Sequence, residues 1–253
     1  ATGKVLWTKN IGVPVRASPT AVNDKVFVVT TEGHVYALAG YDGGELWTYR
    51  GIPERTSIIS NPSPAVEGGV VVVPYPSGEL VALRADDGTP VWTESLARTR
   101  AISSLASLSD AARPAIAGGV VYAVGHGGRL VATDIKSGER LWSLNVAGTQ
   151  APVIAGDTLF VVDTSGQLHA ITRRDGKVIW TVKLPGTSTW SGPTLAGNLL
   201  WLTSNKGQLV GVEPATGRVT VQQNLNSPIY IAPVVASGRM YVLTDEARLV
   251  AFN

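Results

Sequence analysis

The amino-acid sequence predicts an all-β propeller, a single domain over residues 1–253 that consists of six copies of one four-stranded unit. Three observations lead to this fold class. A proline and a hairpin residue recur together six times, a tryptophan follows a turn glycine five times, and no segment of helix length has an amphipathic period.

The first marker is a proline at the start of each unit. A hairpin residue lies fourteen positions after it, and a β-compatible apolar residue lies two positions further on. The prolines are Pro19, Pro64, Pro114, Pro152, Pro193 and Pro233, the hairpin residues are Gly33, Gly78, Gly128, Gly166, Gly207 and Ala247, and the apolar residues are Val35, Leu80, Leu130, Leu168, Leu209 and Leu249. A register that is kept over six copies indicates a repeat architecture.

The second marker is a tryptophan four residues after a glycine, and the residue before that glycine is one that favours turns. The tryptophans are Trp7, Trp47, Trp92, Trp142 and Trp180. We expect all five to be structural interblade residues, and Trp47, Trp92, Trp142 and Trp180 to be nearly fully buried between adjacent sheets. In the remaining copy Gly217 is followed by Val221, which predicts the loosest contact between blades and a position that tolerates tryptophan.

Each unit should contain four strands, which in the first unit are residues 19–22, 25–30, 34–39 and 45–49. The units are expected near residues 19–49, 64–94, 114–144, 152–182, 193–223, and 233–253 completed by 1–9. A four-stranded unit with one apolar face cannot bury that face alone, so the units should stack radially. Pairing of Thr2–Lys9 with Leu249–Phe252 would complete the sixth unit and remove an open sheet edge.

Composition excludes several classes of function. Charged residues make up 16% of the chain and the net charge is +2, without a basic run, so we expect no nucleic-acid partner. The chain has no cysteine, which removes disulfides and thiolate metal sites. No stretch approaches the roughly 20 apolar residues of a transmembrane segment.

The residue types that carry chemistry are scattered. His34, His126 and His169 occupy different positions relative to the hairpin glycine of their units, so they predict no shared metal site. The aspartates before the repeated tryptophans have a structural role as turn residues. Gly125–Gly128 precedes a strand rather than a helix, which favours a hairpin turn over a phosphate loop. We therefore predict no catalytic residue, no metal and no cofactor.

Two connections between units are long, namely Arg50–Pro62 and Thr99–Arg113. Long loops in compact domains are usually functional, and loops on one rim of a propeller form a binding platform. Both loops contain aliphatic residues. They either form the apolar part of such a platform or pack back onto the ring.

The repeat of Asp or Thr, Gly, three residues and Trp resembles the pyrroloquinoline-quinone-type propeller repeat. Within that group, Leu105–Asp110, Gly119–Ala123 and Tyr241–Asp245 resemble the BamB family, the lipoprotein propellers of the outer-membrane β-barrel assembly machine, and the similarity extends over the whole chain. BamB propellers have eight blades, whereas six units are visible here. The chain either closes with six blades, which we favour, or lacks about two N-terminal ones.

The resemblance implies a non-enzymatic scaffold in the periplasm, attached to the inner face of the outer membrane, with its signal and lipid anchor outside this chain. It implies binding to the periplasmic polypeptide-transport-associated domains of the insertase subunit, with unfolded outer-membrane proteins as a further candidate partner. The family's contact residues fall on Thr56, Ser57, Ile58 and Ile59, with Arg55 standing in for a basic residue, and on Leu108 and Asp110.

Two alternatives stay open. One is a general protein-binding propeller with another partner. The other is a relative of the quinoprotein dehydrogenases, in which the same repeat implies a calcium site, a full ring of eight blades and, in many members, a disulfide over the cofactor. The absence of cysteine and the smaller number of units disfavour the dehydrogenase.

Overall fold

The computed structural model describes residues 2–15, 17–51, 63–96 and 112–253, and these residues form strands and turns without a helix. Blades 1 and 2 consist of β1 (Thr20–Val22), β2 (Lys25–Val29), β3 (His34–Ala39), β4 (Glu45–Arg50), β5 (Ala65–Glu67), β6 (Val70–Pro74), β7 (Glu79–Arg84) and β8 (Pro90–Ser95). Blades 3 and 4 consist of β9 (Ala115–Ala117), β10 (Val120–Val124), β11 (Leu130–Asp134), β12 (Arg140–Leu144), β13 (Val153–Ala155), β14 (Thr158–Val162), β15 (Gln167–Thr172) and β16 (Val178–Lys183). Blades 5 and 6 consist of β17 (Trp190–Ala196), β18 (Leu199–Ser204), β19 (Gln208–Val212), β20 (Val219–Asn224), β21 (Val234–Ala236), β22 (Arg239–Leu243) and β23 (Leu249–Phe252).

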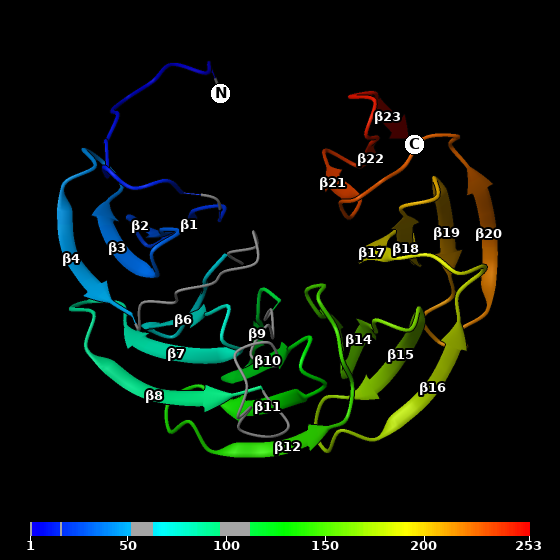
Figure 1. Ribbon diagram of the computed structural model, residues 1–253, viewed down its shortest axis with the longest axis horizontal. Helices are drawn as coiled ribbons and strands as arrows, with labels where there is room; N and C mark the ends of the chain where they lie inside the picture. The colour runs from blue at the N-terminus through cyan, green and yellow to red at the C-terminus, as the bar shows by residue number, and fades with distance from the viewer. Residues whose placement is uncertain (1, 16, 52–62, 97–111) are drawn as a thin grey trace.

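The sheets stand radially around a common axis in chain order, with the fourth strand of each complete blade at the circumference (Figure 1). Within each blade, consecutive strands pair antiparallel. The predicted all-β propeller is therefore confirmed. The strands begin close to the predicted residues, except that β17 starts at Trp190, three residues before Pro193.

The core lies between neighbouring blades. Between blades 1 and 2, for example, Phe27 and Val35 pack in one cluster with Val71, Val73 and Leu83, all of them buried. These residues occupy the middle strands of their sheets, where alternate side chains face each neighbour. Burial from both sides explains why the middle strands are almost continuously apolar.

The repeated tryptophans link each blade to the next. The indole Nε1 of Trp47 donates to the carbonyl oxygen of Ala85 at 3.0 Å, and its ring lies so close to Gly88 that a Cβ there would approach it to 2.6 Å. The same indole bond joins four further pairs: Trp7 to Gly40, Trp92 to Ile135, Trp142 to Arg173 and Trp180 to Pro214. A glycine at positive φ thus provides the space that each ring occupies.

The expectation of nearly complete burial for these tryptophans was wrong for most of them. Trp47 is 8% exposed, whereas Trp92, Trp142 and Trp180 are partly buried. These three tryptophans lie on β8, β12 and β16, the strands at the circumference of the ring (Figure 1).

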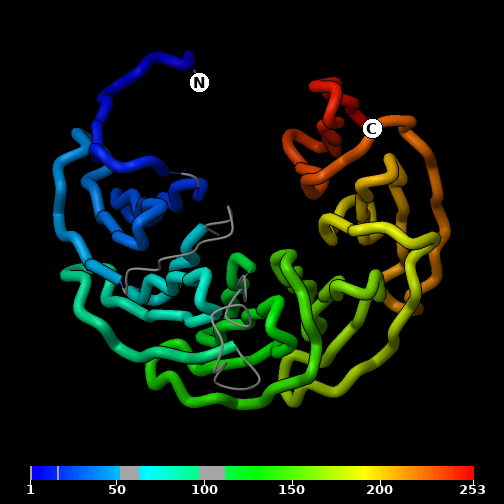
Figure 2. Tube along the Cα trace, in the orientation of Figure 1, coloured from blue at the N-terminus to red at the C-terminus, as the bar shows by residue number. Residues whose placement is uncertain are grey.

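The predicted pairing of Thr2–Lys9 with β23 is absent among the described residues. The sheet of β21, β22 and β23 has three strands, and residues 2–9 form no strand. Trp7 instead holds its segment against blade 1, while β23 lies across an open gap from it (Figure 2). Closure by six blades is therefore not found among the described residues, because the sixth sheet has no fourth strand.

Candidate protein-interaction face

One end of the propeller carries the turns between second and third strands together with the connections between blades. We call this end the connection face. The backbone nitrogen that begins a connection donates to the glycine carbonyl of its own blade's turn: Gly51 to Gly33 at 3.3 Å, Leu96 to Gly78 at 2.8 Å, Leu184 to Gly166 at 3.0 Å and Leu225 to Gly207 at 2.8 Å. Each turn and the connection after its blade are therefore held together as one surface.

The predicted partner-binding residues Arg55, Thr56, Ser57, Ile58, Ile59, Leu108 and Asp110 lie outside the described residues. The described ends of their two connections are well anchored. In the first connection, Gly51 lies against the ring of Tyr75, and the hydroxyl of Tyr75 donates to the carbonyl of Gly33 at 3.1 Å. In the second connection, the buried Ala112 donates its N–H to the carbonyl of Val124 at 3.0 Å. Both connections thus start and end at the connection face of blades 1 to 3.

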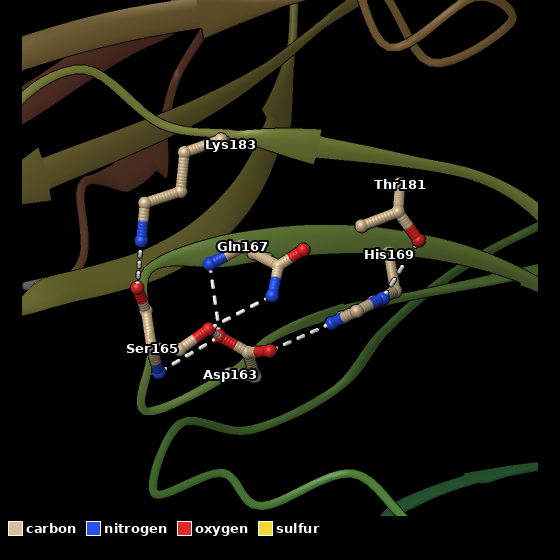
Figure 3. Close-up of polar contacts among 6 residues, drawn as sticks. All are labelled: Asp163, Ser165, Gln167, His169, Thr181 and Lys183. Atoms are coloured by element: carbon tan, nitrogen blue, oxygen red, sulfur yellow. Dashed lines mark hydrogen bonds and ion pairs between the residues drawn. The ribbon is translucent and has the colours of Figure 1, made fainter.

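In blade 4 this face contains a polar network around Asp163 (Figure 3). Asp163 Oδ1 accepts two hydrogen bonds from Ser165, one from its backbone N–H at 2.9 Å and one from its hydroxyl at 2.7 Å. The same oxygen accepts the N–H of Gln167 at 2.8 Å. Asp163 Oδ2 lies 2.9 Å from His169 Nε2, and His169 Nδ1 lies 3.0 Å from Thr181 Oγ1. The network ties the turn between β14 and β15 to both strands of the outer half of the blade.

Burial and hydrogen bonding act in opposite directions on Asp163, whose side chain is 14% exposed. Burial is the largest single influence and raises the pKa, but hydrogen bonds from Gln167, His169 and Ser165 together outweigh it and hold the pKa of Asp163 below its usual value of 3.8. The carboxylate is therefore ionised at neutral pH. His169 belongs to the same network, and its side chain is 12% exposed.

The network contains a serine, a histidine and an aspartate, but their geometry differs from that of a catalytic triad. The hydroxyl of Ser165 donates to Asp163 rather than to His169, whose two ring nitrogens face Asp163 and Thr181. A triad requires the histidine between the hydroxyl and the carboxylate. The arrangement found here orders a turn and does not activate Ser165.

Beside this turn the connection face is hollowed into a pocket of about 240 Å³. Its walls come from the turn of blade 3, the turn of blade 4 and the two connections on either side of blade 4. The lining residues are His126, Thr149, Gln150, Val162, Asp163, Thr164, Ser188, Thr189 and Trp190. No lysine or arginine is among these residues, so the pocket offers hydroxyl, amide and imidazole groups and the hydrogen-bonded carboxylate of Asp163.

The turn residues behave as the sequence predicts, but two tryptophans were missed. Asp42 and Asp87 each accept the N–H two residues ahead. Trp190 and Trp201 fall outside the period of the repeated tryptophans, and this departure from the period is the signal in the sequence that could have found them. Trp190 is buried in the wall of the pocket. In blade 5, Trp201 of β18 occupies the position that Phe27 of β2 holds in blade 1.

Neither a metal site nor a membrane-spanning helix is found among the described residues. Over residues 2–15, 17–51, 63–96 and 112–253, no group of three or more His, Asp or Glu residues could hold a metal ion. Within the same ranges, the structure contains no helix of the length and apolar character that a bilayer crossing requires.

Radial four-stranded sheets with a tryptophan on the outer strand and a glycine opposite define a propeller of the pyrroloquinoline-quinone-type repeat class. Within this class, the family model for outer membrane protein assembly factor BamB matches residues 1–182 and 173–253. The chain belongs to this family.

The relatives match over shorter stretches. Outer membrane protein assembly factor BamB of Burkholderia pseudomallei is 28% identical over 110 residues, which is 43% of this chain and 29% of the relative. The protein of the same name from Nitrosomonas eutropha is 24% identical over 108 residues, 43% of this chain and 26% of the relative. The matched stretches thus span less than a third of either relative.

Solved structures show the same fold. BamB from Moraxella catarrhalis aligns with a TM-score of 0.87 at 20% identity, over 99% of this chain and 76% of that one. A europium-containing methanol dehydrogenase aligns with a TM-score of 0.78 at 14% identity, over 95% of this chain and 63% of that one. Identities this low carry the fold alone, and the fold is shared by assembly factors and dehydrogenases.

Proposed function

We propose that this chain is a non-enzymatic scaffold for the assembly and insertion of outer-membrane β-barrel proteins. Membership of the family described as outer membrane protein assembly factor BamB carries this proposal. The connection face supports it, because hydrogen bonds between turns and connections make it a pre-organised surface, and pre-organisation lowers the entropic cost of binding a partner.

The partner in this proposal is the insertase subunit, bound through its periplasmic polypeptide-transport-associated domains. The contact is assigned to Arg55–Ile59 and to Leu108 and Asp110, where an aliphatic anchor is flanked by charge. The chain would then work in the periplasm at the inner face of the outer membrane. Unfolded outer-membrane proteins are a further candidate partner.

A pull-down with the purified periplasmic domains of the insertase tests this contact. Ile58→Asp and Asp110→Arg should each weaken capture without changing the melting temperature. Tyr41→Asp and Asp157→Arg are matched controls, because both residues are exposed on turns at the opposite end of the blades. Capture of the Ile58→Asp, Asp110→Arg double variant at the wild-type level would contradict the assignment.

Calorimetric titration with calcium and pyrroloquinoline quinone tests the non-enzymatic part of the proposal. A scaffold should give no saturable heat with either compound. A stoichiometric, saturable signal would favour a dehydrogenase, and in that case the shared fold would reflect a shared cofactor.

A further inference from the structure

The pocket beside blade 4 has in its wall a hydrogen-bond donor that the protein leaves without an acceptor. Trp190 is 4% exposed, and its indole N–H has no hydrogen-bond partner among the described residues. The other tryptophans of the chain, all within the described ranges, donate this group to a backbone carbonyl; they are Trp7, Trp47, Trp92, Trp142, Trp180 and Trp201. A buried donor without an acceptor costs free energy, so Trp190 indicates that a bound molecule supplies one.

The N–H edge of the Trp190 ring faces the turn of blade 4. A Cβ added at Gly166, in this turn, would lie 3.4 Å from Cδ1 and 3.6 Å from Nε1 of the ring, and 3.6 Å from the carbonyl oxygen of Ser188. Ser188 lines the pocket, and the same turn contributes Asp163 and Thr164 to it. The unpartnered N–H therefore lies at the wall that the turn and the connection form together, where an oxygen of a ligand can accept it.

Four hydroxyl side chains line the same pocket, and within the described part of the chain none of them takes part in a hydrogen bond. They are those of Thr149, Thr164, Ser188 and Thr189. Gln150 accepts the N–H of Gly192 through its side-chain oxygen at 3.4 Å, which leaves its amide NH₂ group as a further donor. A hydroxyl can donate and accept, so this lining matches a ligand that is itself rich in hydroxyl groups.

The charges around the pocket favour an uncharged ligand. An anionic ligand would need a cationic partner, and the described lining has no lysine or arginine. A cationic ligand would need a free carboxylate, but both oxygens of Asp163 are already engaged in hydrogen bonds.

The volume of the pocket limits the size of the ligand. It is about 240 Å³, which is below the roughly 300–1,000 Å³ of sites that hold drug-sized molecules. A pocket of this size suits a ligand with a single ring.

We propose that this pocket binds an uncharged, polyhydroxylated ligand of the size of one sugar ring, a pyranose that is either free or one unit of a glycan. An oxygen of the ring or of its substituents accepts the N–H of Trp190, and the sugar hydroxyls exchange hydrogen bonds with the hydroxyl side chains of the wall. This site is independent of the insertase contact, which is assigned to Arg55–Ile59, Leu108 and Asp110 in other connections.

The indole N–H signal of Trp190 in a heteronuclear NMR spectrum of the intact chain tests the proposal. Trp190→Phe identifies this signal as the one that disappears. The probes are the uncharged methyl glycosides of glucose, galactose, mannose and N-acetylglucosamine, added at millimolar concentrations because so small a ligand binds weakly. At least one should shift the Trp190 signal saturably while those of Trp47 and Trp142 stay in place. Absence of a saturable shift with all of these sugars would overturn the proposal.

Trp190→Phe also tests the role of the unpartnered N–H in affinity. It should weaken binding of the sugar roughly three- to tenfold, the effect of one hydrogen bond, in a titration followed through the NMR signals of the ligand. Trp201→Phe is the matched control, because Trp201 donates to the carbonyl of Ala196 and packs in a different cluster. An equal loss in both variants would overturn the assignment of this N–H to the ligand.

The hydroxyl lining is tested by Thr189→Val against Thr187→Val. Both residues are exposed in one connection, but Thr189 lines the pocket and Thr187 does not. Thr189→Val should weaken sugar binding roughly three- to tenfold, with unchanged affinity for Thr187→Val. Equal effects of the two changes would overturn the assignment to this pocket.

Ligand charge and ligand length give two further readouts. The uronate that corresponds to the bound sugar should bind more weakly, and an equal or higher affinity would overturn the assignment of an uncharged ligand. A disaccharide that contains the bound sugar distinguishes the two sources, because tighter binding supports a glycan and equal binding supports a free sugar. Asp110→Arg should leave sugar affinity unchanged, so a failure of insertase capture would affect only the proposed function.

Discussion

The contacts of blade 1 and blade 5 with their following neighbours use the same three cross-strand positions with different residues. In blade 1 the row is Phe27, Ala37 and Trp47, with the two rings 5.9 Å apart across the alanine. In blade 5 the row is Trp201, Gly211 and Val221. The tryptophan has moved from the fourth strand to the second, and glycine has replaced alanine beneath it.

In both rows a tryptophan ring lies beside a small central residue, but in blade 5 the tryptophan is on another strand and there is no second aromatic ring. A Cβ at Gly211 would lie 3.3 Å from Trp201 Cζ3 and 3.2 Å from the Cβ of Val221. Gly211 thus has no room for a Cβ unless its neighbours shift, although the contact between blades 5 and 6 contains a pocket of about 350 Å³ beside Trp201. Interiors pack at crystal-like density, so a large side chain gained in one strand has to be balanced in another.

The largest effect is expected for Trp47→Ala. Trp47 is the most deeply buried of the repeated tryptophans, and its removal should lower the free energy of unfolding by about 3–5 kcal/mol. Trp142→Ala should cost less, because that ring is only partly buried. Urea unfolding measures both, and losses below about 1 kcal/mol would show that these residues are not core.

Val221→Trp tests the balance of volume in blade 5. The single change should destabilise the protein by about 1–3 kcal/mol through overpacking, contrary to the tolerance that the sequence pattern predicts. Combining it with Trp201→Phe and Gly211→Ala recreates the residue types found in blade 4 and should recover most of the loss. If the triple variant is no more stable than the single one in urea unfolding, the compensation is wrong.

Gly88→Ala sharpens the role of the glycine opposite each tryptophan. The added Cβ meets the ring of Trp47 and the backbone has φ +73°, so we expect a loss of roughly 2 kcal/mol. Gly68 lies in the same blade at φ +59°, and a Cβ added there would have no atom within 4 Å. Gly68→Ala should therefore cost only the backbone strain, about 1 kcal/mol. Thermal unfolding of the pair separates the two contributions, and equal losses would argue against a steric role.

The smallest effect concerns the turns of blades 4 and 5. Asp163 accepts the N–H groups of Ser165 and Gln167, and Ser204 accepts the corresponding N–H groups of Lys206 and Gln208. Because the folded-state pKa of Asp163 is lowered, its contribution is complete above the usual pKa of 3.8 and is lost as the pH falls through the lowered value.

Asp163→Asn should therefore cost roughly 1–2 kcal/mol at about pH 5 and less at about pH 3, as measured by urea unfolding. Ser204→Ala is the control, and its cost of about 1 kcal/mol should be the same at both pH values because a hydroxyl does not titrate there. A pH-independent cost for Asp163→Asn would show that the charge of the carboxylate does not stabilise the turn.

The sequence alone was sufficient to predict the fold class, most strand positions and the turn aspartates, because these depend on local turn chemistry and on a period that repeats six times. It also led to the BamB family. The candidate site was harder to predict from the sequence. The residues that the resemblance selects lie outside the described ranges, while the pocket of Ser188, Thr189 and Trp190 arises from a strand that starts earlier than the repeat predicts.

Only the tertiary structure decided how the blades meet. The periodicity predicts that Thr2–Lys9 completes the sixth sheet, whereas in the structure Trp7 bonds to blade 1 and the sixth sheet keeps three strands. Trp201, Gly211 and Val221, which form the row of blade 5, are separated in sequence but adjacent in space. Local propensity and period are written along the chain, whereas volume balance and the pairing of polar groups are properties of the assembled interfaces.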